Sequence, residues 1–527
     1  MTNKFQFFNL RFQKTIFILL TILVIAVFFR FWHLSSIPSG VYPDEAINGN
    51  QAISIPGKIF YPENNGREGL FVNLLYLSFS LFGISIWSLK FVSAAIGVLT
   101  VLGLYLLTKE VLRITNYELR ITNNIALLSS FFLAVSFWHV NFSRIAFRAI
   151  LVPFCLVFLF YFLFRGFRTQ KPPNFLLGGI FFGLGFHTYI AYRLSVALII
   201  ITLSLWWIFY RREGRQKKYL FHISCFMLST IVIALPLGIY FLQNPQDFIS
   251  RATGVSIFAS DHPIKDFTKS LALHLAMFNI WGDNNWRHNI SGKPILFWPV
   301  GILFLIGVIY SVWKVLRPRK SVNSLQFIGY CFLLSWWFIM LLPGILTVEG
   351  IPHALRAIGS QPPTFIFAGI GGYLVWLKLK RFFILKPNPL TRFVVPIFLF
   401  ILIGTFIFAQ YYRYFWLWGK NPKVEEAFSK NYVEIGNFLN SLPKETKKYV
   451  IVNQPGVLVK GIPMPSQTVE FIERTKYREP QAIYLLPEDI EKIKIDKEGV
   501  IALMRYDESL LEELAKKFPQ AILLYAR

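Results

Sequence analysis

The sequence is poor in cysteine and in charged residues, and both shortages exclude classes of protein. The three cysteines, Cys155, Cys225 and Cys331, all fall within apolar runs, which excludes a disulfide framework and gives no metal-binding spacing. Charged residues make up 16% of the chain, whereas hydrophobic residues make up 54% and aromatic residues 17%. A soluble protein cannot bury that much apolar surface, so the composition predicts a polytopic membrane protein.

Acidic residues are scarce mainly in the part of the chain before Arg413. That part contains 36 basic and 12 acidic residues, whereas the segment from Arg413 onward contains 18 basic and 16 acidic ones. The net charge of +26 is therefore concentrated in the membrane part, where an excess of basic residues is a topology signal. Nucleic acid is not needed as a partner to explain this charge.

The apolar runs predict an α-helical protein with about eleven transmembrane helices, because a span needs roughly 20 apolar residues. Basic clusters in alternate loops place the N-terminus in the cytoplasm and nine of the twelve acids of the membrane part on the outer face. The first run is long and is followed by no small-residue cleavage site, so we expect an uncleaved span. The expected spans are 15–34, 86–108, 125–142, 149–165, 175–193, 194–210, 222–242, 295–316, 325–347, 361–379 and 393–412.

The chain is expected to divide into a transmembrane domain, residues 1–412, and an extracytoplasmic α/β domain, residues 413–527. The outer loops 35–85 and 243–294 each contain an apolar stretch that is too short to span and is expected to lie along the interface as a helix. The later domain alternates helical and β-rich patterns. Its expected helices are Glu425–Leu442 and Glu508–Phe518, and its expected strands are Tyr449–Val452, Ala482–Leu486, Val500–Met504 and Ala521–Tyr525.

Two adjacent acids, Asp44 and Glu45, follow directly on the first span in the sequence Gly40-Val-Tyr-Pro-Asp-Glu-Ala46. Acids held at a membrane boundary are costly and are usually functional. Asp44 is therefore a candidate catalytic base. Glu45 is either a second catalytic residue or a residue that orders the loop. The alternative for the pair is an ordinary helix start, because Pro followed by Asp is a common helix N-terminal signal.

The outer loops also supply arginines, against the usual enrichment of basic residues on the cytoplasmic side. A phosphate is their natural ligand, because the planar guanidinium group matches phosphate oxygens. The alternative is that these side chains extend to lipid headgroups or order their own loops. The candidate substrate-binding residues of these loops are Arg67, Glu68, Arg144, Arg148, Tyr189, Arg193, Arg287, His288, His353 and Arg356.

A carboxylate and several arginines at a membrane boundary favour displacement of a lipid phosphate from a sugar. The carboxylate takes the proton of the acceptor hydroxyl, and the cations stabilise the departing phosphate. A phosphate leaving group needs no general acid, unlike the alkoxide of glycoside hydrolysis, so one carboxylate is enough. Such a single displacement inverts the anomeric centre.

These motifs resemble the GT-C glycosyltransferases, and in particular glycosyltransferase family 39, the protein O-mannosyltransferase and aminoarabinose-transferase-like group. The resemblance covers roughly residues 15–415. It rests on Tyr42–Ala46 and on the blocks at Arg67–Leu75, Ser143–Ala149, Tyr189–Arg193, Arg287–Asn289 and Pro352–Arg356. It implies a polyprenyl-phosphate sugar donor, an external lipid, glycan or protein acceptor, and Asp44 as the base.

The resemblance also implies that no metal is required. Some relatives carry a divalent ion near the site, which makes Glu68, His288 and His353 candidate ligands. Two other functions remain open: a transporter or flippase of lipid-linked sugars, and a ligase or polymerase that joins them. A transporter usually shows paired repeats with ionisable residues near mid-membrane, and this sequence shows no such pairing.

Overall fold

The computed structural model describes residues 2–114, 119–248, 256–317, 324–384, 389–495 and 498–526. Packing divides the chain into two compact units. The first, which we call the helical unit, contains Met1–Trp32, Ala94–Ser143 and Arg148–Tyr414. The second, which we call the composite unit, contains His33–Ser93, Arg144–Phe147 and Phe415–Arg527.

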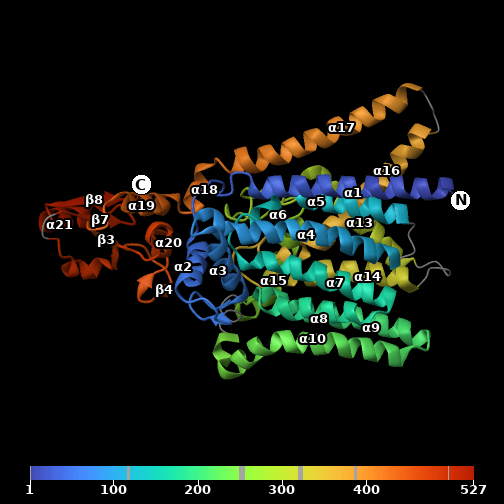
Figure 1. Cartoon of the computed structure of the whole chain (residues 1–527), viewed down its shortest axis with the longest axis horizontal. Coiled ribbons are helices and arrows are strands. Elements are labelled where there is room, and N and C mark those ends of the chain that lie inside the picture. Colours follow the sequence, from blue (N-terminus) through green and yellow to red (C-terminus); the bar gives the residue numbers. More distant parts are fainter. Residues whose placement is uncertain are drawn as a thin grey trace. The chain divides into compact units, whose positions relative to one another are not determined.

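The helical unit consists of long apolar helices that run alongside one another (Figure 1). Helix α8 packs between α7 and α10, and α16 packs against both α5 and α13. The helices of this unit are α1 (Thr2–Phe31), α5 (Leu119–Val135), α6 (Phe137–Phe142), α7 (Leu151–Thr169), α8 (Pro172–Phe186), α9 (Ser195–Arg212), α10 (Gln216–Gln243), α12 (Pro263–Ala276), α13 (Trp298–Leu316), α14 (Ser324–Ile339), α15 (Leu342–Ile345), α16 (Gln361–Ile384) and α17 (Pro389–Tyr411). Helix α4 (Ile86–Ile114) begins in the composite unit and ends in the helical one.

The predicted spans fall mainly on helices, but 125–142 covers both α5 and α6, 175–193 extends past the end of α8 at Phe186, and 325–347 covers both α14 and α15. Among the described residues, eight helical segments are long and apolar enough to cross a membrane, which confirms a multi-pass helical membrane protein, while the number eleven stays a prediction. These segments are Gln13–Phe31, Ile86–Arg113, Arg148–Thr169, Ile190–Arg212, Gln216–Gln243, Trp298–Leu316, Leu325–Ile345 and Ile397–Trp418. Helices α5 and α8 are apolar but shorter. The short apolar stretches of the two long loops also form helices, α3 (Leu70–Phe82) and α12.

The composite unit combines the loop after α1 with the C-terminal segment. From the loop come α2 (Pro43–Ser54), the antiparallel pair β1 (Phe60–Tyr61) and β2 (Arg67–Glu68), and α3. The C-terminal segment contributes α18 (Pro422–Ala427), α19 (Lys430–Ser441), β3 (Lys447–Ile451), β4 (Leu458–Val459), β5 (Ile462–Pro463), α20 (Ser466–Tyr477), β6 (Ile483–Leu485), β7 (Gly499–Leu503), α21 (Glu508–Lys517) and β8 (Ala521–Tyr525).

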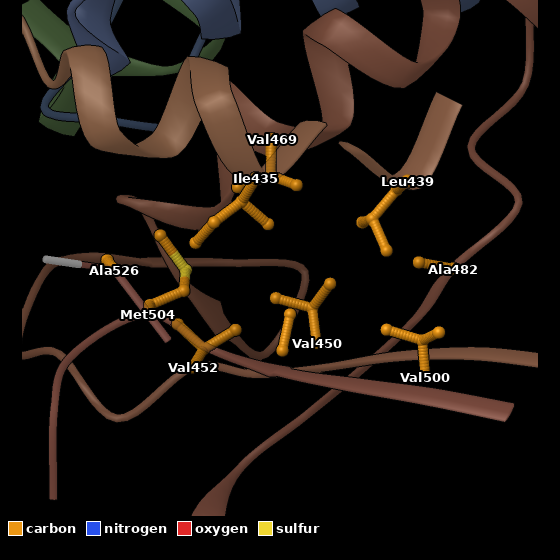
Figure 2. Packing of buried hydrophobic residues seen from close by; sticks show 10 residues of the cluster. Ile435, Leu439, Val450, Val452, Val469, Ala482, Val500, Met504 and Ala526 are labelled. Atoms are coloured by element: carbon orange, nitrogen blue, oxygen red, sulfur yellow. The ribbon is translucent and has the colours of Figure 1, made fainter. Parts of the chain in front are cut away.

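Four parallel strands in the order β6-β3-β7-β8 form the sheet of the C-terminal segment. Both faces of the sheet are covered, as is usual for parallel strands, and successive side chains therefore enter different cores. Val450 and Val500 pack with residues of α19 and α20 on one face (Figure 2). Tyr449 and Ile501 pack with Leu510 of α21 on the other.

The four strands and α21 lie where the sequence predicted them, within one or two residues. The single helix expected at Glu425–Leu442 is wrong, because two helices, α18 and α19, occupy this stretch. The break lies at Ser429, whose φ of 54° is left-handed and cannot continue a helix. Helix α20 was not predicted.

Candidate functional site

Helix α2 begins within the acid pair's motif, with Pro43 as its first residue, a position that needs no backbone donor. Glu45 reaches back to the helix start, where its Oε1 accepts the Tyr42 N–H at 3.2 Å. Two carboxylates in the first turn also suit the positive end of the helix dipole. The helix-start interpretation thus accounts for Pro43 and Glu45. The side chain of Asp44 takes no part in these contacts at the helix start.

Glu45 is fully buried, and both of its oxygens accept backbone hydrogen bonds. Besides the bond from Tyr42, its Oε2 accepts the N–H of Ala146 at 2.7 Å. Burial raises the pKa of Glu45, although the Lys90 ammonium and the two N–H donors act in the opposite direction. Through these bonds Glu45 joins α2 to the segment Arg144–Phe147, as expected of a residue that orders the loop.

Two buried cations hold the backbone that leads into α2. The Lys90 Nζ donates to the carbonyls of Pro38 and Gly40 at 3.1 and 3.0 Å. Arg144 donates from Nη2 to the carbonyls of His33 and Ile37 at 3.0 and 2.8 Å. Because both cations are buried and bound to carbonyl groups, they fix the path of residues 33–40.

Asp44 differs from Glu45 in being only half-buried. Its Oδ1 accepts a hydrogen bond of 2.6 Å from the side-chain amide of Asn64. Asn64 belongs to a turn in which three successive residues, Asn64, Asn65 and Gly66, have left-handed φ values of 54°, 62° and 77°. Strained turns of this kind concentrate at functional sites, and this one presents an amide donor to the candidate base.

Arg67 is buried in the composite unit and lies in a chain of amide groups. Its Nη1 donates to Asn48 Oδ1 at 2.6 Å, and its Nη2 donates to Gln51 Oε1 at 2.5 Å. Asn48 in turn donates to the carbonyl of Ala146 at 3.1 Å. Arg67 therefore fixes the buried polar face of α2. Glu68 is buried on β2, where its backbone is in register with that of Phe60.

A second group of candidate residues lies in the helical unit and contains Asp283, His288 and His353, which we call the histidine cluster. One potential ligand atom from each residue lies within 4.8 Å of the other two. The buried Asp283 contacts His288 Nδ1 at 2.9 Å and accepts the N–H of Ala354 at 2.8 Å. The ring centroids of His288 and His353 are 4.8 Å apart.

His274 of α12 supports this cluster through the backbone. Its Nδ1 donates to the Ser270 carbonyl at 2.8 Å, which leaves Nε2 to accept the N–H of His353 at 3.2 Å. Burial lowers the pKa of His353 well below its ordinary value of 6.5, and the neighbouring histidines and the cations Arg287 and Arg356 lower it further. His353 is thus neutral at physiological pH and can act as an acceptor or a ligand.

A carboxylate and two imidazoles form a donor set that suits a borderline divalent cation such as Zn²⁺. The residues of the histidine cluster therefore fit the divalent ion that the family resemblance allows. His288 and His353 were candidate ligands from the sequence, and Asp283 completes the set. Glu68, the third ligand candidate from the sequence, belongs to the composite unit.

Three other candidate arginines of the helical unit are half-buried and contact aromatic rings or loop oxygens. Arg148 lies over the ring of Tyr189, with 5.5 Å between the guanidinium carbon and the ring centroid. Arg193 lies 4.1 Å from the ring centroid of Phe248 and donates to its carbonyl at 2.8 Å. Arg356 donates to Thr347 Oγ1 at 2.7 Å. Half-buried guanidinium groups of this kind retain surface for a ligand.

The candidates thus fall into separate groups. Asp44, Glu45, Arg67, Glu68 and Arg144 belong to the composite unit, whereas Arg287, His288, His353 and Arg356 gather around Asp283 in the helical unit. Sequence reasoning missed Asn64, Lys90, His274 and Asp283. The turn composition Asn-Asn-Gly was a signal for Asn64, and the proximity of Asp283 to His288 in sequence was a signal for the cluster.

Comparison with solved structures identifies the fold. ArnT from Cupriavidus metallidurans, solved bound to undecaprenyl phosphate, superimposes with a TM-score of 0.51 at 13% identity, over 96% of this chain and 89% of that one. The oligosaccharyltransferase of Archaeoglobus fulgidus is also similar, with a TM-score of 0.46 at 14% identity over 89% of this chain. The chain spans 64% of the length of that oligosaccharyltransferase. Comparison with curated proteins gives no match.

The fold defines the class: the chain is a multi-pass membrane protein with the GT-C glycosyltransferase fold, which confirms the predicted fold class. A comparison with sequence models of protein families gives a match over part of the chain. Residues 70–240 match the dolichyl-phosphate-mannose-protein mannosyltransferase family, PMT_2. The match begins with α3 and ends within α10.

Proposed function

We propose that the protein is an inverting glycosyltransferase that moves a sugar from a polyprenyl-phosphate donor to an acceptor on the outer side of the cytoplasmic membrane. The observation that carries this proposal is the difference between the two adjacent acids. Glu45 is buried and saturated by backbone donors, whereas Asp44 is half-buried and oriented by Asn64. A carboxylate that is oriented and still accessible is suited to accept a proton.

In the proposed reaction, Asp44 takes the proton of the acceptor hydroxyl while the hydroxyl oxygen bonds to the anomeric carbon of the sugar. The bond between that carbon and the phosphate oxygen breaks, and polyprenyl phosphate leaves with the electron pair. Guanidinium groups offset the charge that develops on this phosphate, which is the form of stabilisation that lowers such barriers most. The attack comes from the side opposite the phosphate, so the anomeric centre inverts.

We propose two roles for the candidate arginines, according to their burial. Arg67 and Arg144 are buried and donate to amide and carbonyl oxygens, so we assign them to ordering the loop that carries Asp44. The phosphate-binding role falls to the half-buried arginines, Arg148, Arg193, Arg287 and Arg356. Tyr189, which packs on Arg148, orients one of these groups.

The proposed chemistry requires no metal, because the chain supplies both the base and the cations. If the histidine cluster holds a divalent ion, Asp283, His288 and His353 are the residues that bind it, and the ion supplies positive charge for an anionic ligand. His353, held neutral by its surroundings, is in the protonation state that a metal ligand needs.

Donor turnover by the purified protein tests the proposal. The full chain in lipid nanodiscs is supplied with a panel of polyprenyl-phosphate sugars, and release of polyprenyl phosphate is followed with and without lipid, glycan and peptide acceptors. Asp44→Asn should abolish transfer and leave donor binding largely intact, because the amide keeps the size of the side chain but cannot accept the proton. Asp261→Asn, which changes an exposed acid of the loop 243–294, is the matched control.

The same experiment separates the other functions. Full turnover in Asp44→Asn would remove Asp44 from the mechanism. Movement of an intact lipid-linked sugar between leaflets without cleavage would instead indicate a transporter or flippase. Transfer only between two lipid-linked oligosaccharides would indicate a ligase or polymerase.

A further inference from the structure

The C-terminal segment packs directly on the helix that carries Asp44. Helix α20 lies against α2 within the composite unit, although the two are more than 400 residues apart in sequence. The hairpin β4–β5 adds a second contact, since Val459 and Met464 form an apolar cluster with Ile47 of α2. Helix α2 is therefore enclosed by residues from a distant part of the chain.

Polar contacts between α20 and α2 are buried and specific. The Thr468 Oγ1 donates to the carbonyl of Val41 at 3.0 Å, and both residues are fully buried. Val41 lies three residues before Asp44, at the entrance to the helix. Further along α2, the Asn50 amide donates to the carbonyl and the side-chain oxygen of Gln467, each at 3.0 Å. These bonds fix both the start and the middle of α2.

Shape complementarity adds to these hydrogen bonds. A Cβ at Gly49 of α2 would lie 2.6 Å from the Phe471 ring of α20, so only glycine permits the observed approach. A Cβ at Gly40 would lie 2.3 Å from the carbonyl oxygen of Phe428. Both glycines therefore permit a close approach that an added methyl group would disturb.

From these contacts we propose that helix α20 is part of the catalytic apparatus, with Thr468 as the positioning residue that sets the approach of Asp44 to its substrate. The inference rests on the proposed role of Asp44 as the base. It assigns the C-terminal domain a function in turnover rather than in acceptor recognition. Loss of the Thr468 hydroxyl leaves the buried carbonyl of Val41 without its donor, and the entrance to α2 is then free to shift.

The test compares Thr468→Val, which removes the hydroxyl at nearly constant volume, with Thr468→Ser, which retains it. Thr475→Val is the matched control, because Thr475 lies on the same helix and, among the described residues, its hydroxyl bonds to Ile472 of its own turn. For Thr468→Val we expect kcat to fall about tenfold with little change in the KM of the donor, as when a buried carbonyl loses its partner. The serine variant and the Thr475 control should retain wild-type turnover.

Hydrogen exchange of the α2 amides gives a readout that does not depend on activity. Thr468→Val should lower the protection of residues 43–54, whereas Thr475→Val should not. Gly49→Ala should likewise lower both protection and kcat, because its Cβ would meet the Phe471 ring. Unchanged protection and unchanged kcat in Thr468→Val would overturn the inference.

If the proposed function itself were wrong, the experiments would give a different set of results. If the wild type transfers no sugar from any donor, Asp44 is not the base of such a reaction. Hydrogen exchange alone then decides whether α20 fixes α2. If the wild type is active, a fall in donor affinity at constant kcat would show that α20 serves binding, and would also overturn the positioning role.

Discussion

Replacing Asn64 by glycine isolates the hydrogen bond that orients Asp44. The substitution removes the amide that donates to Asp44 Oδ1 at 2.6 Å. Glycine also adopts the left-handed φ of 54° at this position without strain, so the turn itself can persist. Asn64→Ala would instead confound the lost bond with backbone strain of about 1–2 kcal/mol.

The expected loss of kcat in Asn64→Gly can be estimated because the acceptor of the hydrogen bond, the Asp44 carboxylate, is charged. Hydrogen bonds to charged groups contribute about 1.5–3 kcal/mol. If the full amount orients the carboxylate in the transition state, kcat should fall by a factor of about 10 to 150, since about 1.4 kcal/mol corresponds to tenfold. The KM of the donor should change little, because Asn64 contacts the base, whereas the proposed phosphate contacts are made by other residues.

The assay is steady-state release of polyprenyl phosphate by the full chain in nanodiscs, with kcat and KM determined separately. Asn65→Gly is the matched control: it places glycine in the same left-handed turn, at an exposed residue that follows directly on Asn64. Equal kcat values for Asn64→Gly and the wild type would refute the orienting role. Equal losses in both variants would assign the effect to the turn backbone.

Three further predictions concern the helical unit. Arg356→Ala should weaken donor binding or turnover about tenfold, as expected for a lost guanidinium–phosphate contact, and wild-type kinetics would reduce Arg356 to ordering its loop with Thr347. Dialysis against a chelator should leave transfer intact, because the base and the cations belong to the chain; loss of activity that Zn²⁺ restores would show that the histidine cluster needs its ion. The free energy of unfolding should decline as the pH falls below about 6.5, because the pKa of His353 is lowered in the fold and the unfolded chain therefore binds the proton first. His353→Gln should flatten this decline in thermal unfolding curves, and an unchanged slope would contradict the assignment.

The transmembrane helices could be predicted from the sequence because their signal is local. A run such as Trp298–Leu316 is apolar along its whole length, and no distant residue is needed to recognise it. The strands of the C-terminal sheet could be predicted equally well, since buried parallel strands appear in a sequence as short runs of β-branched residues. Helix α20 escaped prediction because its buried residues include Gln467, Thr468 and Glu473, which interrupt an apolar period.

The candidate site could be predicted only in part, for a related reason. The acid pair and the arginines were visible as charges in unusual places. Their partners were not, because Asn48 of α2 bonds to a residue 98 positions away and Asn50 to one 417 positions away. A buried asparagine looks like any surface asparagine until the fold supplies its acceptor. The different roles that we propose for Asp44 and Glu45 likewise depend on burial, which adjacent letters in a sequence do not reveal.

The close approach at Gly40 has a consequence for building chimaeras. Its φ of 117° and the 2.3 Å between an added Cβ and the Phe428 oxygen mean that any side chain at residue 40 would collide with the backbone at residue 428. Exchanging residues 415–527 for the corresponding part of a relative would therefore join mismatched surfaces, even if each half were intact. A chimaera that exchanges residues 33–93 together with residues 415–527 keeps these surfaces matched, because the composite unit is discontinuous in sequence.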